Sequence, residues 1–575
     1  MSLSKQKLTV PIDPKTPKNK IISEKFLVQN ILRNFQTIKL QKLLKLSGEA
    51  NRYQYFMLIC LSILAVVQAF FITSLFFHFL LPDFSCKSDS GTLINCTLSD
   101  YCSQKELNFV ATVPSIVENF NLICHPKWLL IKTLGYIFLS SSLLAAPLML
   151  LNHILGRKIA LFAYNFIQVL ACLLLIYSSS FSLFTFGLTI NVSCAFCWLI
   201  SGYLYIVESS GKAFHLLSFK VYTLSLGASM FCCGFVCFNF FPFKSVYILL
   251  LVTIIVFSFF YFALVESPVF LKGTSDLLNF YLSLREIARI NFSPRRAQSR
   301  KEKIKRMLFD EVDPSLAESS LSIQSNDNEE LSPKPESLHL KSFPLNHKSI
   351  RKNKKIATRK KIFSLSLSRE SALRLPAATL ISLFYCTAMT LFSAFLTFIF
   401  WFSLQNLSDL DVQSSHVVLS TSFALGVLSM HLFPFRIPSS FSILGNLVMV
   451  SLMLTLSHLT TASPFDSSPP STDLEQFHKS LFGPLLFAFN YFSGIGFFSC
   501  FKASLEQFKR DEQLVASVLV IFALSAGISL GAYFTSSMLL SGASVFWAVL
   551  VVCVLAFPLS LLSPSRHKQP FSNLA

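Results

Sequence analysis

The stretch YQYFMLICLSILAVVQAFFITSLFFHFLL, residues 53–81, holds no lysine, arginine, aspartate or glutamate. The hydrocarbon core of a membrane is about 30 Å thick, and about 20 apolar residues of helix can span it. Hydrocarbon offers the backbone no hydrogen-bond partner, so a crossing segment of this kind must be helical. Residues 53–81 therefore predict a transmembrane helix.

Eleven further runs of the same character follow, in keeping with a composition of 53% hydrophobic and 14% charged residues over 575 positions. The other predicted spans are 129–152, 158–178, 181–206, 217–240, 243–265, 372–402, 416–434, 439–460, 480–501, 514–540 and 542–562. The predicted fold class is an all-α membrane protein with twelve transmembrane helices.

The distribution of positive charge predicts the orientation, because lysine and arginine near span ends favour the cytoplasmic side. Residues 1–52 hold eleven of them and residues 268–371 hold twenty-one, whereas residues 82–128 hold three and residues 403–415 none. We therefore expect both termini and the central loop in the cytoplasm. Residues 1–52 show no signal-peptide pattern, so the first span is expected to insert without cleavage.

The spans form two six-helix halves around a polar central loop. The predicted segments are a cytoplasmic N-terminal segment (1–52), an N-terminal half (53–265) with an external loop (82–128), a basic cytoplasmic loop (266–371), a C-terminal half (372–562) and a cytoplasmic tail (563–575). Within the central loop, Ile287–Asp310 has the apolar spacing of a helix, and Pro314–His347 has the composition of a disordered segment.

The formal net charge is +19, and Arg295–Arg306 and Arg351–Lys361 each have the composition of a nucleic-acid-binding patch. Cytoplasmic lysine and arginine are already required by the orientation, and they also attract anionic lipid headgroups. Membrane lipid is therefore the predicted partner of this charge, and nucleic acid is not.

The external loop carries four cysteines, which predict two disulfides because this compartment is oxidising. Three connectivities are possible, and the sequence does not separate them. The cysteines are Cys86, Cys96, Cys102 and Cys124. Asn95 and Asn406 begin glycosylation motifs on the external side, whereas Asn291-Phe-Ser293 lies inside and is predicted to be unmodified.

No enzyme, cofactor or metal site is predicted. Cys194-Ala-Phe-Cys197 and Cys232-Cys233 lie within spans and have no histidine or second cysteine pair beside them, so core packing explains them better than metal binding. The sequence contains no nucleotide-binding loop, no HExxH and no Ser/His/Asp arrangement. The oligomeric state is left open.

Three segments carry a resemblance to a known family. SIVENFNLICHPKWLLIKTLGYIFLSSSLL (Ser115–Leu144), ESPVFLKG (Glu266–Gly273) and FWFSLQNL (Phe400–Leu407) are similar to segments of the organic cation/anion transporter branch of the major facilitator superfamily. In the first, Phe120, Asn121, Leu122, Cys124 and Trp128 fit the pattern. The resemblance implies two six-helix halves around a central cavity and transport of small organic solutes by alternating access.

The chain departs from the superfamily in the motif that follows span two. MLLNHILGRK (Met149–Lys158) keeps only Gly156, Arg157 and Lys158, and has His153 and Ile154 where an Asp and an Arg are usual. This loss keeps a second interpretation open, in which a transport-incompetent relative serves as a membrane scaffold or sensor.

The resemblance implies that spans one, four, seven and ten border the cavity. The polar residues at their centres are Gln68, Asn191, Thr387 and Asn490, and the same spans hold Tyr203, Tyr385 and Tyr491. We predict that Gln68, Asn191, Asn490 and the three tyrosines contact substrate, with hydrogen bonding between helices as the alternative for the amides. Glu208 is expected to pair with a basic residue of a cytoplasmic gate, where Arg157 and Lys158 also lie.

No charged residue lies at the middle of any predicted span. A fully charged solute would then lack a counter-ion in a cavity of low dielectric constant, and nothing suggests a proton relay. The sequence favours facilitated diffusion of a neutral, zwitterionic or charge-delocalised organic solute. The expected location is the plasma membrane, with an intracellular vesicle membrane as the alternative.

Overall fold

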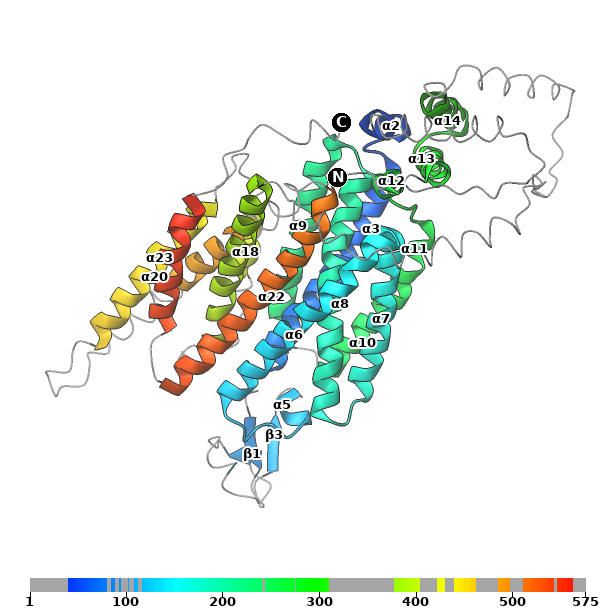
Figure 1. The fold of residues 1–575 in the computed structure, drawn as a ribbon. Coiled ribbons are helices and arrows are strands. Elements are labelled where there is room, and N and C mark those ends of the chain that lie inside the picture. The colour runs from blue at the N-terminus through cyan, green and yellow to red at the C-terminus, as the bar shows by residue number, and fades with distance from the viewer. Residues whose placement is uncertain are drawn as a thin grey trace, which may run out of the picture. The chain divides into compact units, whose positions relative to one another are not determined.

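The computed structural model describes residues 40–79, 84–87, 93–94, 102, 108–111, 116–239, 243–274, 276–309, 377–403, 421–429, 439–461, 484–496, 510–541 and 545–561. Most of them form long, adjacent helices (Figure 1). Contacts divide the chain into two units, and almost all of the described residues belong to the unit of Lys39–Ile304 and Leu383–Ala575.

Six long helices build the N-terminal half: α3 (Arg52–His78), α6 (Lys127–Ile154), α7 (Arg157–Tyr177), α8 (Phe181–Ser209), α9 (Lys212–Asn239) and α10 (Phe243–Ser258), which α11 (Phe260–Ala263) continues. Their common core is apolar, with fully buried side chains such as Trp198, Phe71 and Tyr247. The predicted spans of this half are confirmed to within a few residues.

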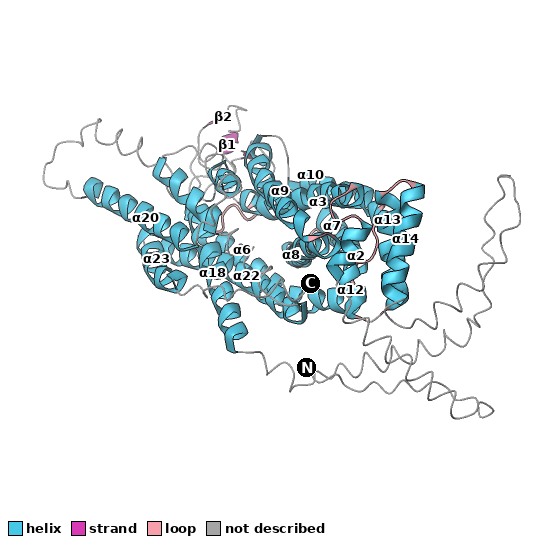
Figure 2. Cartoon of the chain, turned by 90° about the horizontal axis from the view of Figure 1, so that it is seen from above, coloured by secondary structure: helices cyan, strands magenta, loops and turns pink. Residues whose placement is uncertain are grey.

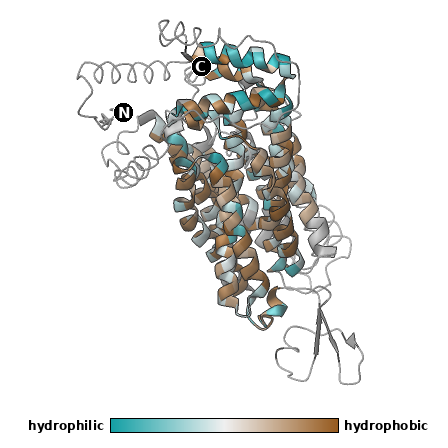
Figure 3. Ribbon diagram, turned by 90° about the vertical axis from the view of Figure 1, so that its right-hand side faces the viewer, coloured by the Kyte–Doolittle hydropathy of each residue, from teal (hydrophilic) through white to brown (hydrophobic). Residues whose placement is uncertain are grey.

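The C-terminal half contains α18 (Ala377–Ser403), α20 (Ser439–Thr461), α22 (Arg510–Ser541) and α23 (Val545–Leu561), with further helical residues at 421–429 and 484–496. Each of the twelve predicted spans therefore contains described helix. Eight of the described helices are long and apolar enough to cross a membrane, and they are mostly brown in Figure 3. The predicted fold class is confirmed.

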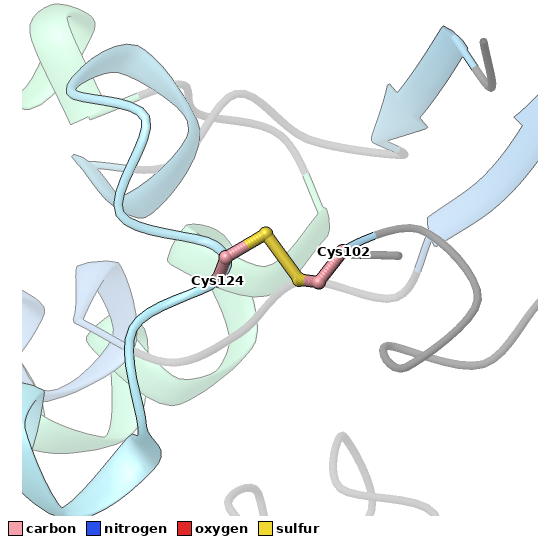
Figure 4. Close-up of a disulfide and its surroundings, with 2 residues drawn as sticks. All are labelled: Cys102 and Cys124. Atoms are coloured by element: carbon pink, nitrogen blue, oxygen red, sulfur yellow. A yellow bond between two sulfur atoms is a disulfide. The ribbon is translucent and has the colours of Figure 1, made fainter. Parts of the chain in front are cut away.

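The external loop contains a small antiparallel sheet, in the order β2-β1-β3, that the sequence did not predict. Its strands are β1 (Phe84–Lys87), β2 (Leu93–Ile94) and β3 (Asn108–Ala111). Cys102 is bonded to Cys124, with their Cα atoms 5.6 Å apart (Figure 4). After the short helix α5 (Ile116–Asn119), Phe120 packs on Phe181 and Phe184 at the start of α8. The disulfide and this ring contact attach the loop to the bundle.

Short helices gather at the opposite end of the bundle from the sheet (Figure 1). They are α2 (Leu40–Ser47), α12 (Pro268–Gly273), α13 (Leu277–Asn291) and α14 (Pro294–Phe309). The single helical stretch predicted for 287–310 is wrong in detail: helix begins earlier, at Leu277, and breaks before Pro294, because proline disfavours helical geometry in the residue before it. The prediction for 314–347 lies outside the described residues.

Glycine is scarce, at 18 residues, but several glycines stand where helices cross closely. A Cβ on Gly426 would lie 2.3 Å from the backbone oxygen of Tyr491, and one on Gly527 would lie 2.6 Å from that of Leu391. Backbones can approach this closely only without a side chain, as is common in membrane helix packing. Gly227 is different, since a Cβ there would meet Val427 at an ordinary 3.5 Å.

These distances predict opposite outcomes for two matched substitutions. Gly426→Ala must displace the backbone of a neighbouring helix and should lower the free energy of unfolding by about 1–3 kcal/mol. Gly227→Ala, at the same group of helices, should change it by less than about 0.5 kcal/mol. Thermal unfolding of both purified variants measures the difference, and equal effects would contradict the close crossing.

The bond between Cys102 and Cys124 leaves Cys86 to pair with Cys96, which lies outside the described residues. Cys86 stands opposite Ile94 in the sheet, two positions before Cys96. Mass spectrometry of non-reduced peptides should therefore recover 102–124 and 86–96 as the linked pairs. Recovery of 86–102 or 86–124 links would contradict this connectivity.

Candidate functional site

Four buried side chains join three helices of the N-terminal half into what we call the amide network: Gln68 of α3, Gln168 and Cys172 of α7, and Asn191 of α8. Gln68 and Gln168 donate to each other's side-chain oxygens at 2.8 and 2.7 Å. Gln168 also donates to Asn191 Oδ1 at 3.3 Å, and Asn191 donates to Cys172 Sγ at 3.1 Å. These bonds give every side-chain amide nitrogen and oxygen of Gln68, Gln168 and Asn191 a partner.

The amide network changes how two predicted substrate residues are understood. Gln68 and Asn191 are fully buried, and both are hydrogen-bonded to Gln168. This is the arrangement expected of amides that join helices. Gln168 is not among the predicted residues because it lies on span three, and the resemblance implies a cavity bordered by spans one, four, seven and ten. Its position near the middle of span 158–178 was the signal that could have found it.

Asn490 is in a different state from the other amides. It is fully buried in helix 484–496, and neither its Oδ1 nor its Nδ2 has a hydrogen-bond partner among the described residues. One turn further along, Ser493 donates to Asn446 Oδ1 of α20 at 3.4 Å. A buried amide with no partner costs about 1–3 kcal/mol, so Asn490 has unused capacity for one acceptor and two donor bonds.

The other candidate residues lie in both halves, and no described hydrogen bond or ring contact joins them to Asn490. Tyr203 is buried between α8 and α9, where its ring lies 5.9 Å from Phe219 and 5.7 Å from Tyr222. Tyr385 and Tyr491 are half-buried in the C-terminal half. Thr387 donates to the carbonyl of Leu383 within its own helix at 2.7 Å.

A second polar site, which we call the carboxylate cluster, lies where α7 begins and α8 ends; its members are Arg157, Glu208, Glu266 and Ser267. Arg157 Nη2 is 2.8 Å from Glu208 Oε1, and both side chains are buried. Ser267 Oγ donates to the other Glu208 oxygen at 2.6 Å. The ion pair is therefore held by hydrogen bonds as well as by charge.

Glu266 caps the N-terminus of α7. Its Oε1 accepts from the backbone N–H groups of Arg157 and Ser267, both at 2.9 Å. Burial raises the pKa of the Glu266 carboxyl, and the backbone N–H groups only partly offset this. Gly156 has φ +100°, and a Cβ there would lie 2.6 Å from Glu266 Oε2, so only glycine admits the carboxylate.

The carboxylate cluster contains or adjoins the residues that match the superfamily motif, which are Gly156, Arg157 and Lys158. Gly156 and Arg157 have partners inside the N-terminal half, and Lys158 donates to the carbonyl of Leu264 at 2.6 Å. His153 and Ile154, at the positions that depart from the motif, are exposed. The expected role of Arg157, Lys158 and Glu208 in a gate stays a prediction.

No group of three or more potential metal ligands occurs in the part of the chain that the structure describes. Asn95, Cys96 and Asn406 lie outside it. Cys194 and Cys197 are buried in α8 as thiols that form no disulfide.

Comparisons with known proteins identify the fold. The xylose transporter XylE from E. coli, in a partially occluded inward-open conformation, matches with a TM-score of 0.50 and 11% identity over 89% of this chain and 99% of that chain. The chain has the major facilitator fold. The human organic anion transporter MFSD10 matches with a TM-score of 0.46 and 13% identity over 88% of this chain and 100% of that chain. No model of a protein family and no curated protein matches the sequence.

The buried ion pair gives a test of the carboxylate cluster. Glu208→Leu removes the buried ion-pair partner of Arg157 and should cost about 3–5 kcal/mol of stability, whereas Glu208→Leu with Arg157→Leu should cost less than either single leucine change. Unfolding of the two single variants and the double variant in detergent measures the coupling between the two side chains. Lys158→Gln, which removes a neighbouring cation whose described side-chain hydrogen bond is to a carbonyl, is the control. Additive effects of the two leucine changes would contradict the coupling.

Proposed function

We propose that this protein is a transmembrane carrier of small organic solutes that works by alternating access, with Asn490 as its main hydrogen-bonding contact to the substrate. The observation that carries the proposal is the unpaired state of the Asn490 side chain within a major facilitator fold. An orphaned amide in a membrane protein is costly, and such polar groups commonly mark substrate paths. Gln68 and Asn191 support the site by fixing the helices of the N-terminal half.

The substrate class follows from the chemistry of the candidate residues. An amide offers two donors and an acceptor but no charge, and the partly exposed Tyr385 and Tyr491 offer aromatic faces. No lysine, arginine, aspartate or glutamate lies at mid-span to balance a full charge. A neutral, zwitterionic or charge-delocalised solute, moved by facilitated diffusion, fits this set.

The resemblance of Ser115–Leu144 and Glu266–Gly273 supports a finer proposal, membership in the organic cation/anion transporter branch. The Cys102–Cys124 bond and the contacts of Phe120 agree with the external loop of that branch. The same resemblance supports the plasma membrane as the location.

Two substitutions test the site by separating binding from folding. Asn490→Leu orphans no partner, so stability should be unchanged or higher, while uptake of a pooled organic-solute library into vesicles of the purified protein should fall at least about tenfold, the worth of one hydrogen bond in a desolvated site. Gln68→Leu leaves Gln168 Oε1 without its donor and should cost about 1 kcal/mol of stability, with uptake per folded molecule retained.

Thermal unfolding and uptake are measured on the same preparations. Unchanged uptake by Asn490→Leu would remove Asn490 from the site. Absence of uptake of every pooled solute by the unmodified protein would favour the scaffold or sensor interpretation instead.

A further inference from the structure

Asn291 fixes a helix corner to the end of a membrane-spanning helix. Its Oδ1 accepts from Tyr53 N, in the first turn of α3, at 2.8 Å. Its Nδ2 donates to the carbonyls of Ser47 and Gly48 at 2.9 and 3.1 Å and to Gln54 Oε1 at 3.1 Å. Because α3 crosses the membrane, the point where α13 ends must lie at the membrane surface on the predicted cytoplasmic side.

Positive charge gathers around this point. Exposed lysines and arginines lie on α2, at the first residue of α3, at the end of α13 and at the start of α14: Lys42, Lys45, Arg52, Arg289, Arg295 and Arg296. We call these six residues the basic corner. Of the acidic residues in segments 40–52 and 276–309, Glu286 is paired with Arg289 at 2.5 Å, and the others are Glu49, Asp276 and Glu302. The local charge therefore remains strongly positive.

The exposed side of α13 adds apolar contacts to this charge. Leu278 and Leu282, one turn apart, are 67% and 42% exposed, and the opposite side of α13 is buried against α2 and α12. Figure 2 shows α2, α13 and α14 side by side, and Figure 3 shows mixed teal and brown helices at this end. Helices with basic residues beside exposed leucines are typical of membrane-surface segments.

We propose that the basic corner binds the headgroups of anionic phospholipids in the cytoplasmic leaflet. Four to eight basic residues directly beside a membrane span attract anionic lipid, and arginine binds phosphate with two parallel hydrogen bonds. The hydrogen bonds of Asn291 hold the corner where such headgroups lie. The proposal does not depend on transport, since it requires only the described contacts and the cytoplasmic placement of α13.

The test uses the full chain, purified in neutral detergent and titrated with phosphatidylserine or phosphatidylcholine while native mass spectrometry counts bound lipids. The unmodified protein should prefer phosphatidylserine, and the preference should shrink as salt rises from about 0.05 M to about 0.5 M, since salt screens charges. Lys45→Gln with Arg295→Gln and Arg296→Gln should weaken phosphatidylserine binding at least about tenfold. The charge-preserving variant Arg295→Lys with Arg296→Lys should retain most of the phosphatidylserine binding.

A charge-matched control distinguishes the basic corner from net charge. Lys352→Gln with Lys354→Gln and Lys355→Gln removes the same charge from the central loop and should weaken phosphatidylserine binding at least about threefold less than the corner variant does, because none of these lysines belongs to the basic corner. Equal loss in both triple variants, or no preference for phosphatidylserine in the unmodified protein, would overturn the proposal. Tighter binding of duplex RNA than of phosphatidylserine would also overturn it.

Discussion

Hydrocarbon cannot pair with a polar group, and this constraint underlies the whole structure. It requires the backbone to be helical through the membrane, and it requires buried side-chain amides to find partners in neighbouring helices. The reciprocal bonds of Gln68 and Gln168 show the second requirement met between α3 and α7. Where it is not met, as at Asn490, the structure contains a polar group that a solute could use.

The two halves meet this constraint differently in their described parts. The N-terminal half is joined by side-chain hydrogen bonds and by the ion pair of Arg157 and Glu208. The C-terminal half relies more on close backbone contact at glycines such as Gly426 and Gly527. Polar bonds fix the geometry of helices strongly, whereas glycine contacts depend on shape alone.

The ends of the bundle carry separate tasks. On the predicted external side, one disulfide and the Phe120 contacts attach a small sheet to α6 and α8. On the predicted cytoplasmic side, Glu266 caps α7 and Asn291 caps the start of α3. Each end therefore ties a non-membrane segment to a spanning helix through one or two residues. This arrangement keeps polar segments next to the membrane without placing them in it.

The sequence alone determined the helical class, the twelve spans and the two halves, because run length and hydropathy act locally and need no knowledge of neighbours. It also predicted that Glu208 pairs with a basic residue at the cytoplasmic end of the spans, where Arg157 lies. Only the tertiary structure decided which amides pair: Gln68, Asn191 and Asn490 look alike in sequence, yet two have partners and Asn490 has none among the residues that the structure describes. The reason is physical, since a hydrogen bond between helices depends on which faces meet, and residues 100 positions apart, such as Gln68 and Gln168, meet only after the bundle has packed.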